Sequence, residues 1–177
     1  MGLWLSLAVA MVLKKPLRII GKVRTIILGM GNPMRGDDSV GLHAVRALRD
    51  KLNKLDITVI EASVTGMDCL ELLAGYDRAV IIDAIHTMEG KTGQIYRLEL
   101  EAFDTNGYAN TSHDVDFVTA IELGRRLGLA LPRQIVIFAI EVGDAHSFSE
   151  KCTAAASQAI PNCVRMICQE LSEHSNA

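Results

Sequence analysis

Few residues of this chain belong to the types that mark special classes of protein. Of its 177 residues, 5% are aromatic, 4 are cysteine and 4 are proline, and the formal net charge is −3. Without a basic excess there is no global electrostatic attraction to nucleic acid. The cysteines form no CxxC pair, and a domain of this size needs no disulfides. We therefore expect reduced thiols, packed as small buried hydrophobes, in a cytoplasmic protein.

Acidic residues are missing from the first 36 positions, where the order of residue types is also unusual. The apolar run MGLWLSLAVAMVL is followed by basic residues at positions 14, 15, 18, 22 and 24. The run is shorter than the roughly 20 residues of a membrane-spanning helix. A secretory signal would carry its positive charge before the apolar run. We expect no transmembrane span and interpret residues 1–23 as a leader of unassigned role, at most a weak surface tether.

Residues 24–177 alternate between strand-like and helix-like segments, and the chain is 49% apolar and 22% charged, as in a globular protein. The expected strands are 24–28, 57–60, 79–82, 94–100 and 135–140. The expected helices are 37–48, 67–74, 113–127 and one whose first turn holds Pro161. This order predicts a single α/β domain with a mostly parallel twisted sheet of about five strands and helices on both faces. The irregular segment 94–100 is expected at an edge of that sheet.

Acidic side chains follow four of the expected strands. Asp37 and Asp38 lie in the loop after the first strand, within GMGNPMRGDDSVG, and Glu61, Asp83 and Glu141 end three others. The carboxyl ends of parallel strands share one edge, where such sheets bind ligands, so these carboxylates are expected to converge. Converging carboxylates repel one another unless a cation or a proton lies between them.

Each of these acids also has a structural interpretation. Asp37 and, less well, Asp38 would suit the N-cap of the first helix. Glu61 and Glu141 would suit hydrogen bonds to backbone amides of neighbouring loops. Asp83 is harder to explain in this way, because an acid directly after a buried apolar run is unfavourable without a partner.

His113 adds an imidazole to this set. It stands at an expected helix start, four residues before Phe117, and so shares the core-facing side of that helix. Two carboxylates and one imidazole suit a borderline divalent ion such as nickel, zinc or iron, and the ligands alone do not choose among these. His86, close to Asp83 in the sequence, is the second choice.

The glycine loop also permits a dinucleotide-binding interpretation. Gly29-x-Gly31 follows a strand, and Glu61 lies near the distance expected of a ribose-binding acid. However, the third glycine is Gly36, which gives the spacing GxGxxxxG. Asp37 and Asp38 would also oppose a pyrophosphate at the helix terminus. This interpretation is therefore the less favoured one.

Three segments, in order and spacing, resemble the [NiFe]-hydrogenase maturation proteases. They are LGMGNPMRGDDSVG, VIIDAI and TSHDVDF, and the likeness spans about residues 24–166. The resemblance implies an endopeptidase that removes a C-terminal extension from the hydrogenase large-subunit precursor after nickel insertion. It also implies that the site recognises nickel carried by the substrate, and we expect other divalent metals to be able to substitute for it.

The resemblance assigns roles to individual residues. Asp38, Asp83 and His113 fall on the metal-binding positions. We expect Asp38 and Asp83 also to be catalytic, as in an aspartic-type peptidase, which the resemblance itself does not specify. The family often has glutamate where Asp38 stands, so the reach of this side chain is shorter. Supporting roles are implied or expected for Gly31, Asn32, Asp37, Gly41, Glu61, Gly66 and Glu141.

The cleavage chemistry stays open at this point. No Ser-His-Asp order and no HExxH motif is present. A carboxylate would activate water, or the metal would polarise the peptide carbonyl. A nickel-sensing chaperone without catalytic activity would use the same three residues and is the principal alternative.

Overall fold

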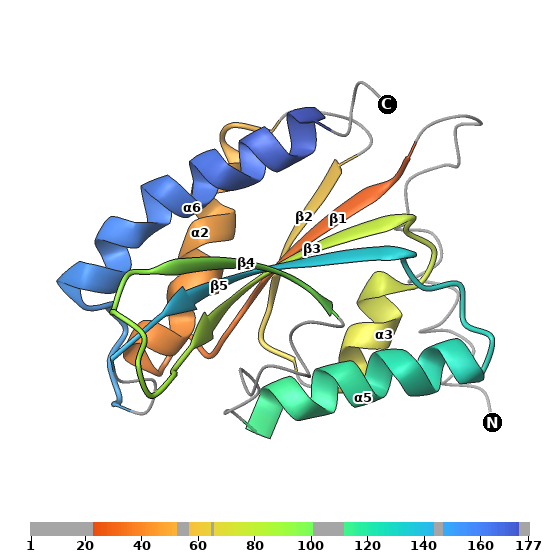
Figure 1. The fold of residues 1–177 in the computed structure, drawn as a ribbon, viewed down its shortest axis with the longest axis horizontal. Helices are drawn as coiled ribbons and strands as arrows, with labels where there is room; N and C mark the ends of the chain where they lie inside the picture. The colour runs from red at the N-terminus through yellow and green to blue at the C-terminus, as the bar shows by residue number, and fades with distance from the viewer. Residues whose placement is uncertain (1–22, 53–56, 65, 101–111, 144–146, 174–177) are drawn as a thin grey trace.

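The fold is a five-stranded sheet between two layers of helices (Figure 1). The computed structural model describes residues 23–52, 57–64, 66–100, 112–143 and 147–173, without the side chains of residues 112–116. The strands are β1 (Thr25–Met30), β2 (Ile57–Ala62), β3 (Arg78–Ile85), β4 (Ile95–Glu99) and β5 (Gln134–Glu141). Their order in the sheet is β2-β1-β3-β5-β4. The predicted α/β class and the predicted strand number are confirmed.

Four strands are parallel, and only β4 runs antiparallel to its neighbour β5. Every residue of β1 and nearly every residue of β3 and β5 is buried, because helices cover both faces of the central sheet. This double burial explains why these strands read as continuous apolar runs. β4 is only half-buried at the end of the sheet, as expected for the irregular segment 94–100.

The helices divide between the two faces of the sheet (Figure 1). α2 (Val40–Arg49) and α6 (Ala154–Glu173) pack on one face, around a core that includes Val80, Ile82 and Phe138. α3 (Asp68–Leu73) and α5 (Ser112–Arg126) pack on the other, around a core that includes Ile81 and Ile85. A short 3-10 helix, η1 (Gly36–Ser39), leads from β1 into α2. We call the edge at which the four parallel strands end the carboxyl edge.

The start of the last helix differs from the prediction. Pro161 was expected in the first turn, but α6 begins at Ala154 and Pro161 lies inside it. Three alanines follow Thr153, and alanine has the highest intrinsic helix propensity. Burial of the stripe Ala156, Ala159 and Cys163 then stabilises helix on both sides of the proline.

The expected leader is residues 1–23. All of it except Val23 lies outside the described residues. Within the described ranges, none of the helices combines the length and apolar character needed to cross a bilayer.

Candidate functional site at the carboxyl edge

Glycines in the loop after β1 allow the chain to pack against itself at the carboxyl edge. A Cβ on Gly31, whose φ is +139°, would lie 1.9 Å from the carbonyl oxygen of Asp38. A Cβ on Gly41 would lie 2.4 Å from the carbonyl oxygens of both Met30 and Ile82. Any larger residue would therefore push η1 and α2 away from the ends of β1 and β3. The glycines bring the Asp38 loop close to β3, which bears Asp83 near its end.

The amides of this loop are used within the protein. Asn32 N donates to Asp38 Oδ2 at 2.8 Å, and Met34 N donates to Asn32 Oδ1 at 2.9 Å. Gly36 N donates to the carbonyl oxygen of Ser149 at 2.6 Å. A phosphate cradle would need such amides to point at a ligand. Here the Asp38 carboxylate accepts the hydrogen bond of the Asn32 amide in place of a ligand, which argues against the dinucleotide interpretation.

Asp37 is an anchor between the loop and α6. Its side chain is buried, with 1% of its surface exposed. Oδ1 accepts a hydrogen bond from Thr153 N at 2.6 Å, and Oδ2 accepts one from Thr153 Oγ1 at 2.9 Å. Neither η1 nor α2 has a side-chain cap, so the N-cap interpretation of Asp37 and Asp38 was wrong. The role of Thr153 was not predicted from the sequence. The only sequence feature that points to it is its position directly before an alanine run, at a helix start.

Asp83 lies on the face of the sheet that α3 and α5 cover. Ile81, Asp83 and Ile85 occupy every second position of β3 and so point to the same face, and both isoleucines belong to the core on that face. The side chain is partly exposed, and its Oδ1 accepts a hydrogen bond from Ala84 N at 2.8 Å. Burial, followed by the negative charge of Asp83, raises the pKa of the Cys69 thiol on α3 to about 11. The Asp83 carboxylate thus lies near the start of α3.

His113 is the second residue of α5, and its side chain lies outside the described part of the chain. Phe117, four residues later, is buried in the core that contains Ile81 and Ile85. Among the residues whose side chains are described, no three His, Cys, Asp or Glu residues come together as a metal site. The predicted set of Asp38, Asp83 and His113 therefore stays a prediction.

Glu141 holds the turn that follows β3. It is 1% exposed, and its carboxylate accepts hydrogen bonds from Thr87 N at 2.6 Å and Thr87 Oγ1 at 2.9 Å. A Cβ on Gly90 would lie 2.1 Å from Glu141 Oε2, so the turn also needs its glycine. In the same region, His86 Nδ1 is 2.9 Å from the carbonyl oxygen of Val142. Glu141 thus supports the carboxyl edge by binding a neighbouring loop, one of the two roles foreseen for it.

Glu61 is engaged by two arginines of α2. Arg46 Nε and Nη2 donate to Glu61 Oε2 at 3.0 and 2.7 Å, and Arg49 Nη1 lies 3.5 Å from Oε1. The hydrogen bond from Arg46 is the main reason that the pKa of the Glu61 carboxyl is lowered. Glu61 therefore ties β2 to α2. Further along, Gly66 has a φ of +50° in the turn before α3, where its carbonyl oxygen accepts from Cys69 N.

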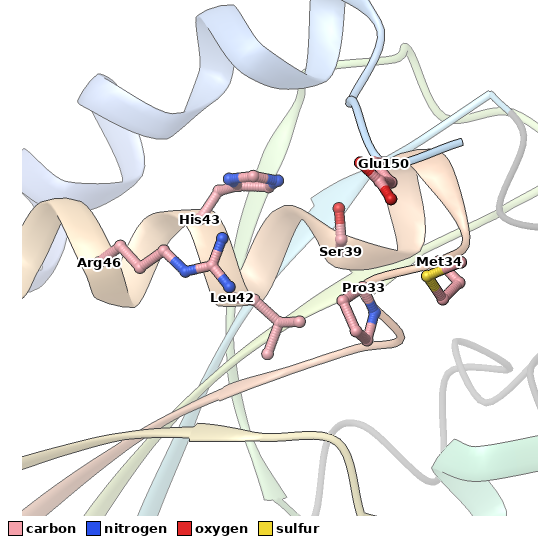
Figure 2. Close-up of a pocket in the computed structure, with 7 residues that line it drawn as sticks. All are labelled: Pro33, Met34, Ser39, Leu42, His43, Arg46 and Glu150. Carbon is pink, nitrogen blue, oxygen red and sulfur yellow. The ribbon is translucent and has the colours of Figure 1, made fainter. Parts of the chain in front are cut away.

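A pocket of about 250 Å³ lies beside the glycine loop (Figure 2). It is lined by Pro33, Met34, Ser39, Leu42, His43, Arg46 and Glu150. His43 and Arg46 come from one side of α2, and Glu150 comes from the segment after β5. Burial and the positive charge of Arg46 lower the pKa of His43, so its imidazole is mostly neutral at pH 7. The pocket thus combines apolar walls with neutral and charged hydrogen-bonding groups.

These features define an α/β protein whose candidate site is built from carboxylates at the carboxyl edge of a parallel sheet. The family described as hydrogenase maturation protease matches residues 42–170, a range that includes Asp83 and His113 and begins after Asp38. The chain belongs to this family. It is an endopeptidase that acts in hydrogenase maturation, as the resemblance predicted.

Individual relatives agree with this assignment. The chain is 24% identical over 153 residues to the hydrogenase expression/formation protein HupD of Bradyrhizobium diazoefficiens, covering 85% of this chain and 79% of that one. It is 30% identical over 88 residues to the hydrogenase 2 maturation protease of Escherichia coli, covering 48% of this chain and 54% of that one. The fold is similar to the hydrogenase maturating endopeptidase HybD of E. coli, with a TM-score of 0.74, 20% identity and coverage of 86% and 94%.

Proposed function

We propose that this endopeptidase removes a C-terminal extension from the large-subunit precursor of a [NiFe] hydrogenase after nickel has been inserted. In this proposal, Asp38, Asp83 and His113 bind the nickel that the precursor carries. The metal then reports that assembly of the precursor is complete. The family role is established. The identity of the substrate, the nickel that it carries and the three metal ligands are the parts that we propose here.

The observation that carries the proposal is the meeting of two carboxylate-bearing elements at the carboxyl edge. β1, whose loop bears Asp38, pairs with β3, which bears Asp83 near its end. Gly41 packs on the carbonyl oxygen of Ile82, the residue before Asp83. α5 runs back across the sheet to reach the start of the parallel strand β5, so its first turn, with His113, is on the side of the carboxyl edge (Figure 1).

The chemistry of these three side chains suits the proposed cargo. Two carboxylates and an imidazole are ligands that nickel and neighbouring divalent ions accept, so zinc or another such ion would substitute in binding assays. A carboxylate at the edge of the site can also accept a proton from the water that attacks the scissile peptide bond. Asp38 and Asp83 are the residues that we assign to this step.

The proposed location is the cytoplasm. All four cysteines are free thiols, and Cys69 and Cys163 are completely buried. Such thiols are typical of a reducing compartment.

The test is incubation of the protein with nickel-loaded and nickel-free large-subunit precursor, followed by mass spectrometry of the large subunit. We expect shortening only of the nickel-loaded form. Asp38→Ala, Asp83→Ala and His113→Ala should each weaken nickel binding in calorimetry by at least about tenfold, because each removes one of three ligands, and should abolish shortening.

The matched control is Asp50→Ala, which removes an exposed acid at the other end of α2. It should retain both properties. Unchanged nickel affinity in all three site variants would contradict the ligand assignment. A stable complex with the nickel-loaded precursor that never yields a shorter product would instead favour the nickel-sensing chaperone.

A further inference from the structure

The loops at the carboxyl edge each carry one large apolar side chain that is exposed to solvent. Met34, Met67, Met88 and Phe148 follow β1, β2, β3 and β5, and their exposed fractions are 53%, 51%, 98% and 85%. We call these four residues the apolar rim. The other exposed large apolar residues in the described ranges are Val23, Leu123, Leu127 and Leu129. Those four precede β1 or lie in the second half of α5 and the turn into β5, toward the opposite edge.

Hydrogen bonds hold the turn that contains Met88 in place, although the Met88 side chain is almost fully exposed. Thr87 is bound through both its amide and its hydroxyl to the buried Glu141, and Gly90 N donates to Thr87 Oγ1 at 2.9 Å. A buried carboxylate is unfavourable unless it is well hydrogen-bonded, so its use here indicates that this turn must keep its shape. Met88 projects from the middle of that turn.

The other members of the rim also stand on hydrogen-bonded backbone. Ser149 N donates to the carbonyl oxygen of Met34 at 3.1 Å, and Ser149, which receives the amide of Gly36, directly follows Phe148. Met67 is the N-cap residue of α3, and its carbonyl oxygen accepts a hydrogen bond from Leu70 N at 3.1 Å. Apolar side chains on ordered loops lose little backbone entropy on binding, which favours a protein interface.

We infer that the apolar rim docks the folded body of the nickel-loaded large-subunit precursor around the scissile tail. This inference rests on the proposed function. Met34 and Met88 belong to the loops that follow β1 and β3, the strands that lead to Asp38 and bear Asp83, and Met67 and Phe148 belong to the loops after the neighbouring strands β2 and β5. A protein substrate at the site therefore meets them. Met34 also lines the pocket beside the glycine loop (Figure 2). Methionine adapts to irregular partner surfaces, and three of the four rim residues are methionine.

The high exposed fractions of the rim side chains favour the folded precursor, rather than its C-terminal tail alone, as the partner that covers them. Met88 and Phe148 are too exposed to be walls of a peptide groove, so a short tail bound at the site would leave them largely in water. A folded partner surface would cover them. The rim should therefore contribute to affinity for the whole precursor and not to affinity for a short peptide.

The experiment compares Met88→Ser and Phe148→Ser with the matched control Leu127→Ser, which removes a side chain that is 66% exposed away from the rim. The dissociation constant for nickel-loaded precursor is measured by biolayer interferometry. The same is done for a synthetic peptide with the sequence of the precursor C-terminus. Each rim variant should bind the precursor about tenfold more weakly, as for a residue central to an interface. Leu127→Ser should change this constant less than twofold.

Binding of the peptide and of nickel should be the same in all variants, and circular dichroism should show an unchanged fold because the replaced side chains are exposed. Precursor affinity within twofold of the unmodified protein in both rim variants would overturn the inference. If those variants also still cleave the precursor, the proposed function stands without it. Failure of the unmodified protein to bind the precursor at all would overturn both.

Discussion

At the scale of single residues, adjacent acids at the carboxyl edge have different tasks. Asp37 is buried and fully engaged by Thr153, whereas its neighbour Asp38 is partly exposed and accepts from Asn32 N. Glu141 and Glu61 are likewise engaged by Thr87 and by arginines of α2. Asp37, Glu141 and Glu61 thus hold loops and strands in place, and the proposed function uses Asp38 and Asp83, which are both partly exposed.

The Asp37 anchor leads to a prediction at this scale. Thr153→Val keeps the shape of the side chain but removes the hydroxyl that donates to Asp37 Oδ2. Loss of one partner of a buried carboxylate should lower the free energy of unfolding by about 1–3 kcal/mol. Urea denaturation measures this change. Thr153→Ser keeps the hydroxyl and should be much closer to the unmodified protein; equal losses in both variants would contradict the role of the hydrogen bond.

At the scale of elements, a buried ion cluster ties two strands to the last helix. Glu170 of α6 accepts from Arg78 of β3 and from Arg97 of β4, the latter at 2.7 Å between Arg97 Nε and Glu170 Oε2. Arg78 and Glu170 are 4% and 6% exposed. Arg97, which also pairs with Glu99, has a raised pKa chiefly because of its hydrogen bond to Glu170. The cluster therefore joins the edge strand, a central strand and α6 at one point.

Removing the charge of Glu170 should strongly weaken this junction. Glu170→Gln leaves the positive charge of Arg78 buried without its counter-ion, which should lower the free energy of unfolding by about 3 kcal/mol. The matched control is Glu173→Gln, three residues later on the same helix and exposed. It should change stability by less than about 0.5 kcal/mol. Chemical denaturation of the two variants checks this, and similar stabilities would contradict a structural role for the cluster.

At the scale of the whole molecule, the two cores on either side of the sheet are assembled from residues between Ile26 and Leu171 among those that the structure describes. β1 begins at Thr25, two residues after Val23, the last residue of the expected leader. The candidate site residues, from Gly31 to Glu141, all come after the expected leader. The α/β domain thus has its own hydrophobic cores.

A chain that begins at Lys22 should therefore fold and keep its cleavage activity. The expected result is an unchanged far-ultraviolet circular dichroism spectrum, a melting temperature within a few degrees, and shortening of nickel-loaded precursor at an unchanged rate. A truncated protein that folds but no longer cleaves would show that the leader takes part in function. Membrane flotation of the two forms tests the surface tether separately.

Local pattern was enough to predict the architecture and the position of the candidate site. Apolar runs and helical stripes depend on neighbouring residues, and parallel strands must end at one edge, so Asp38 and Asp83 were assigned to that edge without knowledge of any contact. The edge position of β4 followed in the same way from its irregular pattern. The outlines of the fold are therefore largely a consequence of local sequence.

The tertiary structure alone decided which acids anchor the loops at the carboxyl edge. Asp37 and Thr153 are 116 positions apart, and Glu141 and Thr87 are 54 apart. No periodic pattern links such residues, because their pairing depends on how the loops pack once the sheet has formed. For the same reason Pro161 could not be assigned correctly: burial of the α6 stripe against the sheet, a tertiary interaction, stabilises helix around a residue that by itself disfavours it.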